Sequence, residues 1–324
     1  MKFFDKMSDF NEVYQDIYLE CKEELKKQKI KTIVMQIVYI CMLFGGGILI
    51  LQVIKSLDHI GYIVNMNNSV SVIGDVTSFI GESITICIVL CAYIKMAGNY
   101  YTKTRDSYNK TYKEKVIKTM IKSFSGKLNY NPRAGVGGYG YIDADFESFD
   151  ELKAEDGISG RLEDKFSIKI SEVHTKRKQI TKNGRVNFNT VFHGLFAELE
   201  TDKYVEDTIK IRKNTIKIFD SNDRLEMDSG EFEKIYDIYS KNKIEAMQIF
   251  TADILQLFID FEDLNPDVTI KNNKIYIRFE TGDVFEPTFL KNALEYETLK
   301  KYYYMIGFML YFSKEIYKNL PLEI

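Results

Sequence analysis

The longest uninterrupted run of hydrophobic residues lies at positions 32–54 and contains no charged side chain. Lys31 precedes this run and Lys55 follows it. A helix over this range rises roughly 35 Å, which is enough to cross a hydrocarbon core of about 30 Å. The pattern therefore predicts a first transmembrane helix at residues 32–54.

A second apolar run lies at residues 72–94, with Asp75 near its start and Glu82 near its middle. A charged group at the bilayer centre costs about 2.5–3.5 kcal/mol on insertion scales, and the apolar remainder of this run offsets that cost. We therefore predict a second transmembrane helix at 72–94 and a short exterior loop at 55–71.

Glu82 is the candidate intramembrane polar residue. In an antiparallel pair of helices with these bounds, Glu82 lies at the depth of Gly45, Gly46 and Gly47, where small residues let two helices approach closely. An ion or proton relay is one interpretation of Glu82. A protonated carboxyl that hydrogen-bonds to the facing helix or to an oligomer partner is the interpretation that we favour, because one acid on two spans makes a poor transport path.

Polar residues on both sides of the two runs set the predicted topology. Lysine and arginine are frequent at 22–31 and 95–115, whereas the loop at 55–71 carries Lys55 alone. The positive-inside rule therefore predicts two cytoplasmic termini. Helical spacing of apolar residues also predicts an amphipathic N-terminal helix at 1–31 and a stalk helix at 95–125.

Short strands dominate the remainder of the chain, residues 126–324. Apolar and polar residues alternate at 166–170, and Asn183-Gly184 predicts a hairpin turn that leads into a long strand at 187–200. Further strands are expected around 209–218, 232–238 and 268–279, with helices at 247–261 and 294–320. Runs of strands followed by helices predict an α+β fold with a largely antiparallel sheet and packed C-terminal helices.

Composition adds limits to this picture. The net charge is −3, so no global electrostatic attraction to nucleic acid is expected. The four cysteines, Cys21, Cys41, Cys87 and Cys91, all precede residue 92. The predicted domain therefore needs no disulfide framework. The partners that we expect are the lipid bilayer and either a protein partner or a second copy of this chain.

Catalytic motifs are absent from the sequence: it has no nucleophile elbow, no zinc-type His-Glu-x-x-His and no dinucleotide fingerprint. His174 and His193 lie at comparable distances from the turn at Asn183-Gly184 and could face each other, with Glu172 nearby. Complete metal-ligand sets are uncommon, so we predict no metal, no cofactor and no catalytic residues. The acids at 143–150 are expected to form a solvated loop.

Several short motifs occur in a fixed order along the predicted domain. They are Glu155-Asp156-x-Ile158-x-Gly160, Ser171-Glu172-Val173, Val191-Phe192-x-Gly194-Leu195-Phe196, Phe232-Glu233-Lys234-x-Tyr236, Lys274-Ile275-Tyr276-Ile277 and Phe285-Glu286. Over residues 112 to 320 this order resembles the uncharacterised bacterial domain-of-unknown-function family numbered 3137. The resemblance implies a bacterial plasma-membrane protein with two spans before a cytoplasmic domain, and it supplies no activity.

The motif residues themselves have a structural interpretation. Asp156 and Gly160 fit a turn, and a buried Glu172 needs a partner. Alternation puts Phe192 and Phe196 on one face of a strand, with space at Gly194 for a crossing element.

The sequence as a whole predicts a membrane-anchored cytoplasmic module that binds or scaffolds a partner. The alternative is a membrane-tethered, hydrolase-like enzyme with a site made from dispersed acids and His174 or His193. A small transport or channel subunit that uses Glu82 ranks third. An enzyme requires a pocket that converges on perturbed ionisable groups, whereas a binding module shows an exposed apolar patch or an open sheet edge.

Overall fold

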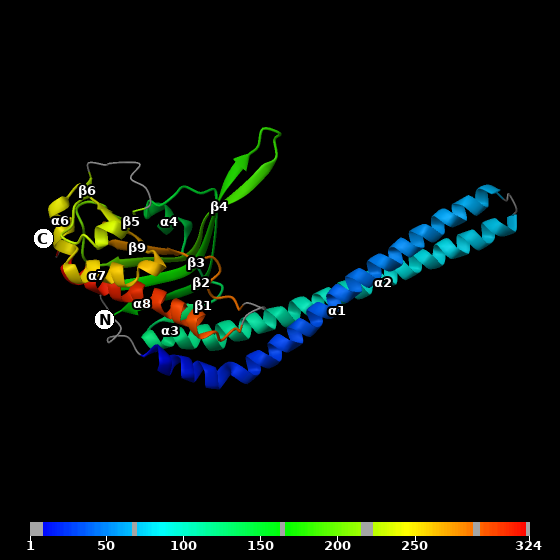
Figure 1. The fold of residues 1–324 in the computed structure, drawn as a ribbon, viewed down its shortest axis with the longest axis horizontal. Coiled ribbons are helices and arrows are strands. Elements are labelled where there is room, and N and C mark those ends of the chain that lie inside the picture. Colours follow the sequence, from blue (N-terminus) through cyan, green and yellow to red (C-terminus); the bar gives the residue numbers. More distant parts are fainter. Residues whose placement is uncertain (1–8, 67–69, 163–165, 215–222, 288–291, 322–324) are drawn as a thin grey trace. The chain divides into compact units, whose positions relative to one another are not determined.

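The structure is a computed structural model that describes residues 9–66, 70–162, 166–214, 223–287 and 292–321 (Figure 1). The chain forms two compact units. We call residues 21–112, with 288–293, the helical hairpin, and we call residues 1–20, 113–287 and 294–324 the domain. The two units are described separately.

The helical hairpin consists of helix α1 (Phe10–Met66), which begins in the domain, and helix α2 (Val70–Tyr112). Helix α1 continues beyond the predicted boundary at Ile54, so the predicted exterior loop at 55–71 is helical in its described part. The described part of this segment up to Met66 has no proline and a single glycine, Gly61, so its sequence does not interrupt the helix.

Contacts between the two helices fix their register. The Thr32 hydroxyl donates to the carbonyl of Thr104 at 3.3 Å, and the space beside Gly46 is filled by Leu90 and Ile94. Because α1 continues to Met66 and α2 begins at Val70, each residue of α1 meets α2 several positions later than we predicted. Glu82 therefore does not lie opposite the triple glycine, and its side chain is exposed.

Large apolar side chains lie on the outside of the helical hairpin. Phe44 is 73% exposed and Ile88 is 64% exposed. Only 6% of the most apolar window of the first helix is buried, and 11% of the window of the second. A core helix of a soluble protein buries such a window, so this pattern does not fit one. Both helices are long and apolar enough to cross a membrane.

The helical geometry of the chain changes directly after α2, where the domain begins. A π-helical turn, Lys113–Ile117, follows α2 and leads into helix α3 (Lys118–Phe124). The helix expected at 95–125 thus ends at Phe124. Lys113, Val116 and Ile117 are buried, so this turn is part of the domain's packing.

A sheet of nine described strands forms the centre of the domain, and all the pairings between these strands are antiparallel. Its strand order is β1-β2-β3-β4-β9-β8-β5-β7-β6. The strands are β1 (Asn129–Asn131), β2 (Glu151–Leu162), β3 (Phe166–Ile180), β4 (Val186–Thr201), β5 (Ile209–Lys213), β6 (Arg224–Leu225), β7 (Tyr236–Tyr239), β8 (Asp267–Lys271) and β9 (Lys274–Glu280). The predicted α+β fold with an antiparallel sheet is confirmed.

Helix α8 (Tyr296–Asn319) lies across one face of this sheet (Figure 1). Its Phe308 and Phe312 pack against Phe258 of helix α7 (Ala252–Asp260), and Phe308 also contacts Phe279 of β9. The first turns of α1 pack on α8 as well, since the Phe10 ring lies 5.2 Å from the Tyr303 ring. Aromatic side chains therefore supply most of the largest buried groups between sheet and helices.

The opposite face of the sheet carries helix α4 (Gly138–Asp143), which begins within the glycine run that we expected to be a connector. Its Tyr141 packs against Phe192 and Phe196, whose rings lie 5.8 and 5.3 Å away. Phe192 and Phe196 thus share a face, and they lie in a buried cluster with Val173 and Tyr276.

Two other predicted elements differ from the structure, and a third cannot be compared with it. Phe232 begins a short helix, α5 (Phe232–Ile235), before strand β7. The helical stripe at 247–261 is two helices, α6 (Lys243–Ile249) and α7, separated at Phe250-Thr251. The strand partner expected at Ile216 and Ile218 lies outside the described residues.

Strands β3 and β4 extend beyond the rest of the sheet as a two-stranded β-ribbon, residues 176–190 (Figure 1). The predicted turn at Asn183-Gly184 is present, and Gly184 has a φ of +73°, a conformation that glycine adopts without strain. Pairing with β2 ends at Lys176, and pairing with β9 ends at Gly194. Apart from Lys176, which pairs with Glu151 of β2, the β-ribbon is therefore paired within itself and with no other described strand.

Candidate functional site

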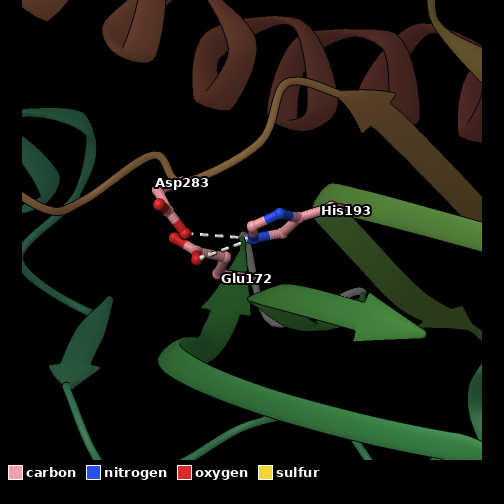
Figure 2. A group of neighbouring side chains, drawn as sticks. All are labelled: Glu172, His193 and Asp283. Atoms are coloured by element: carbon pink, nitrogen blue, oxygen red, sulfur yellow. Dashed lines mark ion pairs between the residues drawn. The ribbon is translucent and has the colours of Figure 1, made fainter. Parts of the chain in front are cut away.

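The register of β3 and β4 brings three of the sequence-predicted residues together. His174 lies directly opposite His193. Glu172 lies two residues before His174 on β3, so its side chain is on the same face of the sheet. The two imidazole rings stack with centroids 4.3 Å apart. The Nε2 of His193 lies 3.5 Å from Oε1 of Glu172 (Figure 2). The Nε2 of His174 instead contacts the hydroxyl of Thr190 at 2.9 Å.

Asp283 completes this group, and sequence reasoning missed it. Its Oδ1 lies 3.1 Å from Nε2 of His193, and Figure 2 shows both carboxylates directed at that nitrogen. Asp283 follows β9, where the amides of Thr281 and Gly282 both donate to the carbonyl of His193. The Thr281-Gly282 turn thus carries Asp283 back over the end of β4. No spacing pattern in the sequence links Asp283 to Glu172 and His193, which lie 90 or more positions earlier.

Gly194 permits this return of the chain. A Cβ atom at Gly194 would collide with the carbonyl oxygen of Phe279 and lie 2.8 Å from the amide nitrogen of Thr281. The close crossing element expected beside Gly194 is therefore the backbone at the end of β9. Only glycine allows that approach, so Gly194 helps to place Asp283 beside His193.

Glu172 is held in a buried, mostly apolar environment. Its side chain is 5% exposed, and its Oε2 accepts a hydrogen bond from the amide of Val284 at 3.0 Å. Burial raises the pKa of Glu172, and the carboxylates of Asp156 and Asp283 raise this pKa further. Burial also raises the pKa of Tyr302 to about 12, with the carboxylates of Glu172 and Asp283 adding to the effect. In the part of the chain that the structure describes, no lysine or arginine forms an ion pair with Glu172.

Asp156 belongs to a second buried polar group next to the first. It lies at a bulge inside β2, with a φ of +57°, rather than in the turn that we predicted. Its carboxylate accepts hydrogen bonds from Lys113 at 2.7 Å and from the Tyr130 hydroxyl. Lys113 also forms an ion pair with Glu286 at 2.5 Å.

Burial raises the pKa of Asp156, although its hydrogen bonds from Lys113 and Tyr130 oppose the shift. Burial acts to lower the pKa of Lys113, but its hydrogen bonds to Asp156 and Glu286 outweigh this effect and raise that pKa. Lys113 therefore stays protonated, and one cation serves two carboxylates. Gly160 also lies within β2, where a Cβ atom would come within 2.5 Å of the Lys127 carbonyl.

The segment 283–286 connects the two polar groups. Asp283 faces His193, the amide of Val284 holds Glu172, and Glu286 reaches Lys113. Val284 and Phe285 are fully buried and anchor the segment in the core. A short stretch after β9 therefore fixes the position of both groups.

A second polar region covers the other face of the sheet. The acids at 143–147, expected in a solvated loop, are paired with cations: Asp143 with Lys271, Asp145 with Lys210, and Glu147 with Arg278. Hydrogen bonds from Lys271 and Tyr276 lower the pKa of Asp143 despite partial burial, which acts to raise it.

A cavity of about 430 Å³ borders this polar region. It is lined by Asp145, Asp207, Thr208, Lys210, Asp223, Tyr239, Ser240, Lys241 and Lys271. Acidic and basic side chains are equal in number around this cavity, so it favours no ligand of one charge. The charged side chains of Asp145, Lys210 and Lys271 at this cavity are accounted for by the ion pairs that hold α4 and the residues after it against the sheet.

Within the described part of the chain, Glu172, His193 and Asp283 are the group of three potential metal-ligating side chains whose donor atoms converge. These donor atoms all lie within 4.8 Å of one another. His174 is close but is not part of the convergent set. This group, which we call the Glu-His-Asp cluster, is the best-defined candidate site of the domain.

Comparison with known proteins shows a similarity to one family over part of the domain. Residues 190–318 match the model of a family described as "Protein of unknown function (DUF3137)". This match confirms the resemblance drawn from the sequence, over a range that begins at β4 and ends in α8. The motifs at 155–173 lie outside it. No curated protein matches the chain at a significant level.

One solved structure was found to be similar, the crystal structure of the mycobacterial trehalose monomycolate transport factor A, TtfA. It shares 11% sequence identity, covers 64% of this chain and 95% of its own chain, and has a TM-score of 0.35. A similarity at this TM-score is too low to carry an argument about fold or function.

Proposed function

We propose that this chain is a membrane-anchored binding module whose helical hairpin crosses the bacterial plasma membrane twice and whose domain lies in the cytoplasm. The observation that carries the proposal is the exposure of large apolar side chains along both helices, of which only 6% and 11% of the apolar windows are buried. In water this surface would be costly, at about 25 cal/mol for each Å² of apolar area. A lipid environment removes that cost.

The orientation follows from charge. The stretches at 22–31 and 95–115 are rich in lysine and arginine, and both lie on the domain side of the apolar windows. Under the positive-inside rule, these stretches and the domain lie in the cytoplasm.

The β-ribbon is the surface that we assign to partner binding. It carries five basic side chains and no acid. The five are Lys176, Arg177, Lys178, Lys182 and Arg185. Ile180, Val186 and Phe188 are 65%, 45% and 45% exposed, and the pairing of Ile180 with Val186 and of Lys178 with Phe188 puts all four on one face. An exposed apolar patch with a basic rim fits a protein partner that has an acidic surface around an apolar centre.

A protein fits this surface better than a lipid bilayer. The tip of the β-ribbon, residues 181–185, reads Thr-Lys-Asn-Gly-Arg and is polar. Insertion of Ile180 and Val186 into hydrocarbon would carry Lys182 and Arg185 in first, at a high desolvation cost. A partner that covers the flat face of the β-ribbon avoids that cost.

The topology is tested with a cysteine-free variant that carries Lys182→Cys at the tip of the β-ribbon. A membrane-impermeant thiol reagent is expected to label it only after the cells are lysed. Labelling of intact cells would place the domain outside the cytoplasm and overturn the orientation.

Partner binding is tested with a photo-crosslinking amino acid at Phe188 in the full chain in cells, with the same group at Tyr204 as the control. Tyr204 is 46% exposed and lies outside the β-ribbon. Discrete protein adducts from position 188 that are lost in an Ile180→Ser, Val186→Ser variant are expected. Adducts to lipid alone, or the same adducts from position 204, would contradict the proposal.

A membrane-tethered hydrolase is a second candidate function, and the convergence of Glu172, His193 and Asp283 favours it. A buried carboxylate with a raised pKa beside an imidazole is a common arrangement for acid–base chemistry. No described contact favours the transport role considered for Glu82, which faces outward from the helical hairpin.

A further inference from the structure

We propose that Glu172, His193 and Asp283 form a binding site for one divalent transition-metal ion of the zinc type. The site provides one imidazole nitrogen and two carboxylate oxygens, a ligand set that such ions accept. The proposal does not depend on the membrane topology or on the β-ribbon.

Distances between the donor atoms support a shared ion. Zinc binds nitrogen and oxygen ligands at about 2.0–2.2 Å, so neighbouring ligand atoms of a tetrahedral site lie about 3.3–3.5 Å apart. The Nε2 of His193 lies 3.5 Å from Oε1 of Glu172 and 3.1 Å from Oδ1 of Asp283. Small side-chain adjustments bring all three atoms to one ion. Asp283 can make them because its side chain is 71% exposed.

The ligands are held in position by other contacts. The amide of Val284 binds Oε2 of Glu172, which leaves Oε1 directed at His193. The backbone of His193 is fixed by the amides of Thr281 and Gly282, and its ring lies flat against His174 with an interplanar angle of 9°. Groups of this kind orient ligands in metal sites and support their affinity.

Charge also favours a bound cation. Glu172 and Asp283 lie near Asp156 and Glu286, and Lys113 is the cation that pairs with the last two. Among the described residues, no lysine or arginine forms an ion pair with Glu172 or Asp283, and the side chain of Glu172 is 5% exposed. A divalent ion between Glu172, His193 and Asp283 would balance this charge. Its remaining coordination positions would face the exposed side of Asp283, so water or a substrate oxygen could occupy them.

Metal binding is tested with the full chain in detergent micelles after treatment with a chelator. Co²⁺ titration, followed by the visible d–d absorption bands, and equilibrium dialysis with Zn²⁺ are expected to show one bound ion per chain. His193→Ala and Asp283→Asn are expected to weaken binding more than about tenfold. Glu172→Gln keeps an acceptor for the Val284 amide and is expected to do the same.

Two substitutions are matched controls. His174→Gln changes the histidine that stacks on His193 without being a ligand, and Glu280→Gln changes an exposed acid three positions before Asp283. Both are expected to retain binding within about threefold, well inside the loss expected for ligand removal. The proposal is overturned if the wild-type chain retains no Zn²⁺ on dialysis. It is equally overturned if His193→Ala and Asp283→Asn bind like the wild type, with Asp283→Asn showing the wild-type unfolding profile.

Discussion

The helical hairpin and the domain treat apolar side chains in opposite ways. In the domain, Phe258 is fully buried among four aromatic rings, whereas Phe44 of the helical hairpin is 73% exposed. The domain buries its large apolar side chains within its own fold. The helical hairpin leaves its large apolar side chains exposed to the surroundings. Apolar composition alone therefore does not tell a core from a lipid-facing surface, and burial decides between them.

The largest expected effect that tests this contrast comes from Phe258→Ala. Removal of a fully buried ring is expected to lower the free energy of unfolding of the domain by about 4 kcal/mol, through lost transfer energy and a cavity. Phe44→Ala in detergent is expected to change it by less than about 0.5 kcal/mol. Thermal and urea unfolding followed by circular dichroism measure both. Equal losses would contradict the contrast.

Lysines on the continuous helix that links the two units provide a smaller test. Lys113 is buried and serves Asp156 and Glu286, whereas Lys110, one turn earlier, is exposed. Lys113→Met leaves Asp156 buried without its cation, so we expect a loss of about 3 kcal/mol. Lys110→Met is expected to cost less than about 0.5 kcal/mol. The same unfolding assay compares the two, and a tolerated Lys113→Met would show that Asp156 is held by Tyr130 alone.

The smallest expected effect is a pH dependence that belongs to the domain. Burial raises the pKa of Glu172 above its value in the unfolded chain. Its contribution to stability is therefore full below the unfolded pKa and is lost as pH rises through the folded pKa. In the presence of chelator, Glu172→Gln is expected to gain stability relative to the wild type as pH rises from about 4 to about 8. A difference that is constant with pH would show that Glu172 does not titrate abnormally.

Most elements of the fold follow from the sequence because their signals are local. The Asn183-Gly184 turn and the alternation along β3 and β4 each predict their own geometry from a few neighbouring residues. The loop predicted at 55–71 is longer than the structure has it, because the uncharged run ends at Ile54 whereas the helix continues to Met66. The sequence predicts a strand at Phe232, where the structure has helix α5, because a helix of four residues is too short to show a helical period in the sequence.

The candidate site could be predicted only in part. The turn at Asn183-Gly184 sets a register in which Lys176 faces Thr190, and a bulge between Thr175 and Lys176 shifts it by one residue so that His174 faces His193. The turn brings the two histidines near each other, but their direct pairing depends on the bulge. Asp283 reaches His193 through the bend after β9 and the close approach at Gly194, which are tertiary features. The cations that pair with the acids at 143–147 come from β5, β8 and β9, and they too were invisible without the sheet order.

The absence of acids from the β-ribbon has a consequence for self-association. A two-stranded ribbon without neighbouring strands presents unsatisfied backbone groups, and two copies could join edge to edge. Two such ribbons repel each other because each carries five positive charges, and this repulsion weakens when salt shortens the Debye length to less than about 10 Å. At low ionic strength, two copies of the chain therefore keep their ribbons separate, and aggregation through this edge is expected to begin when salt is added.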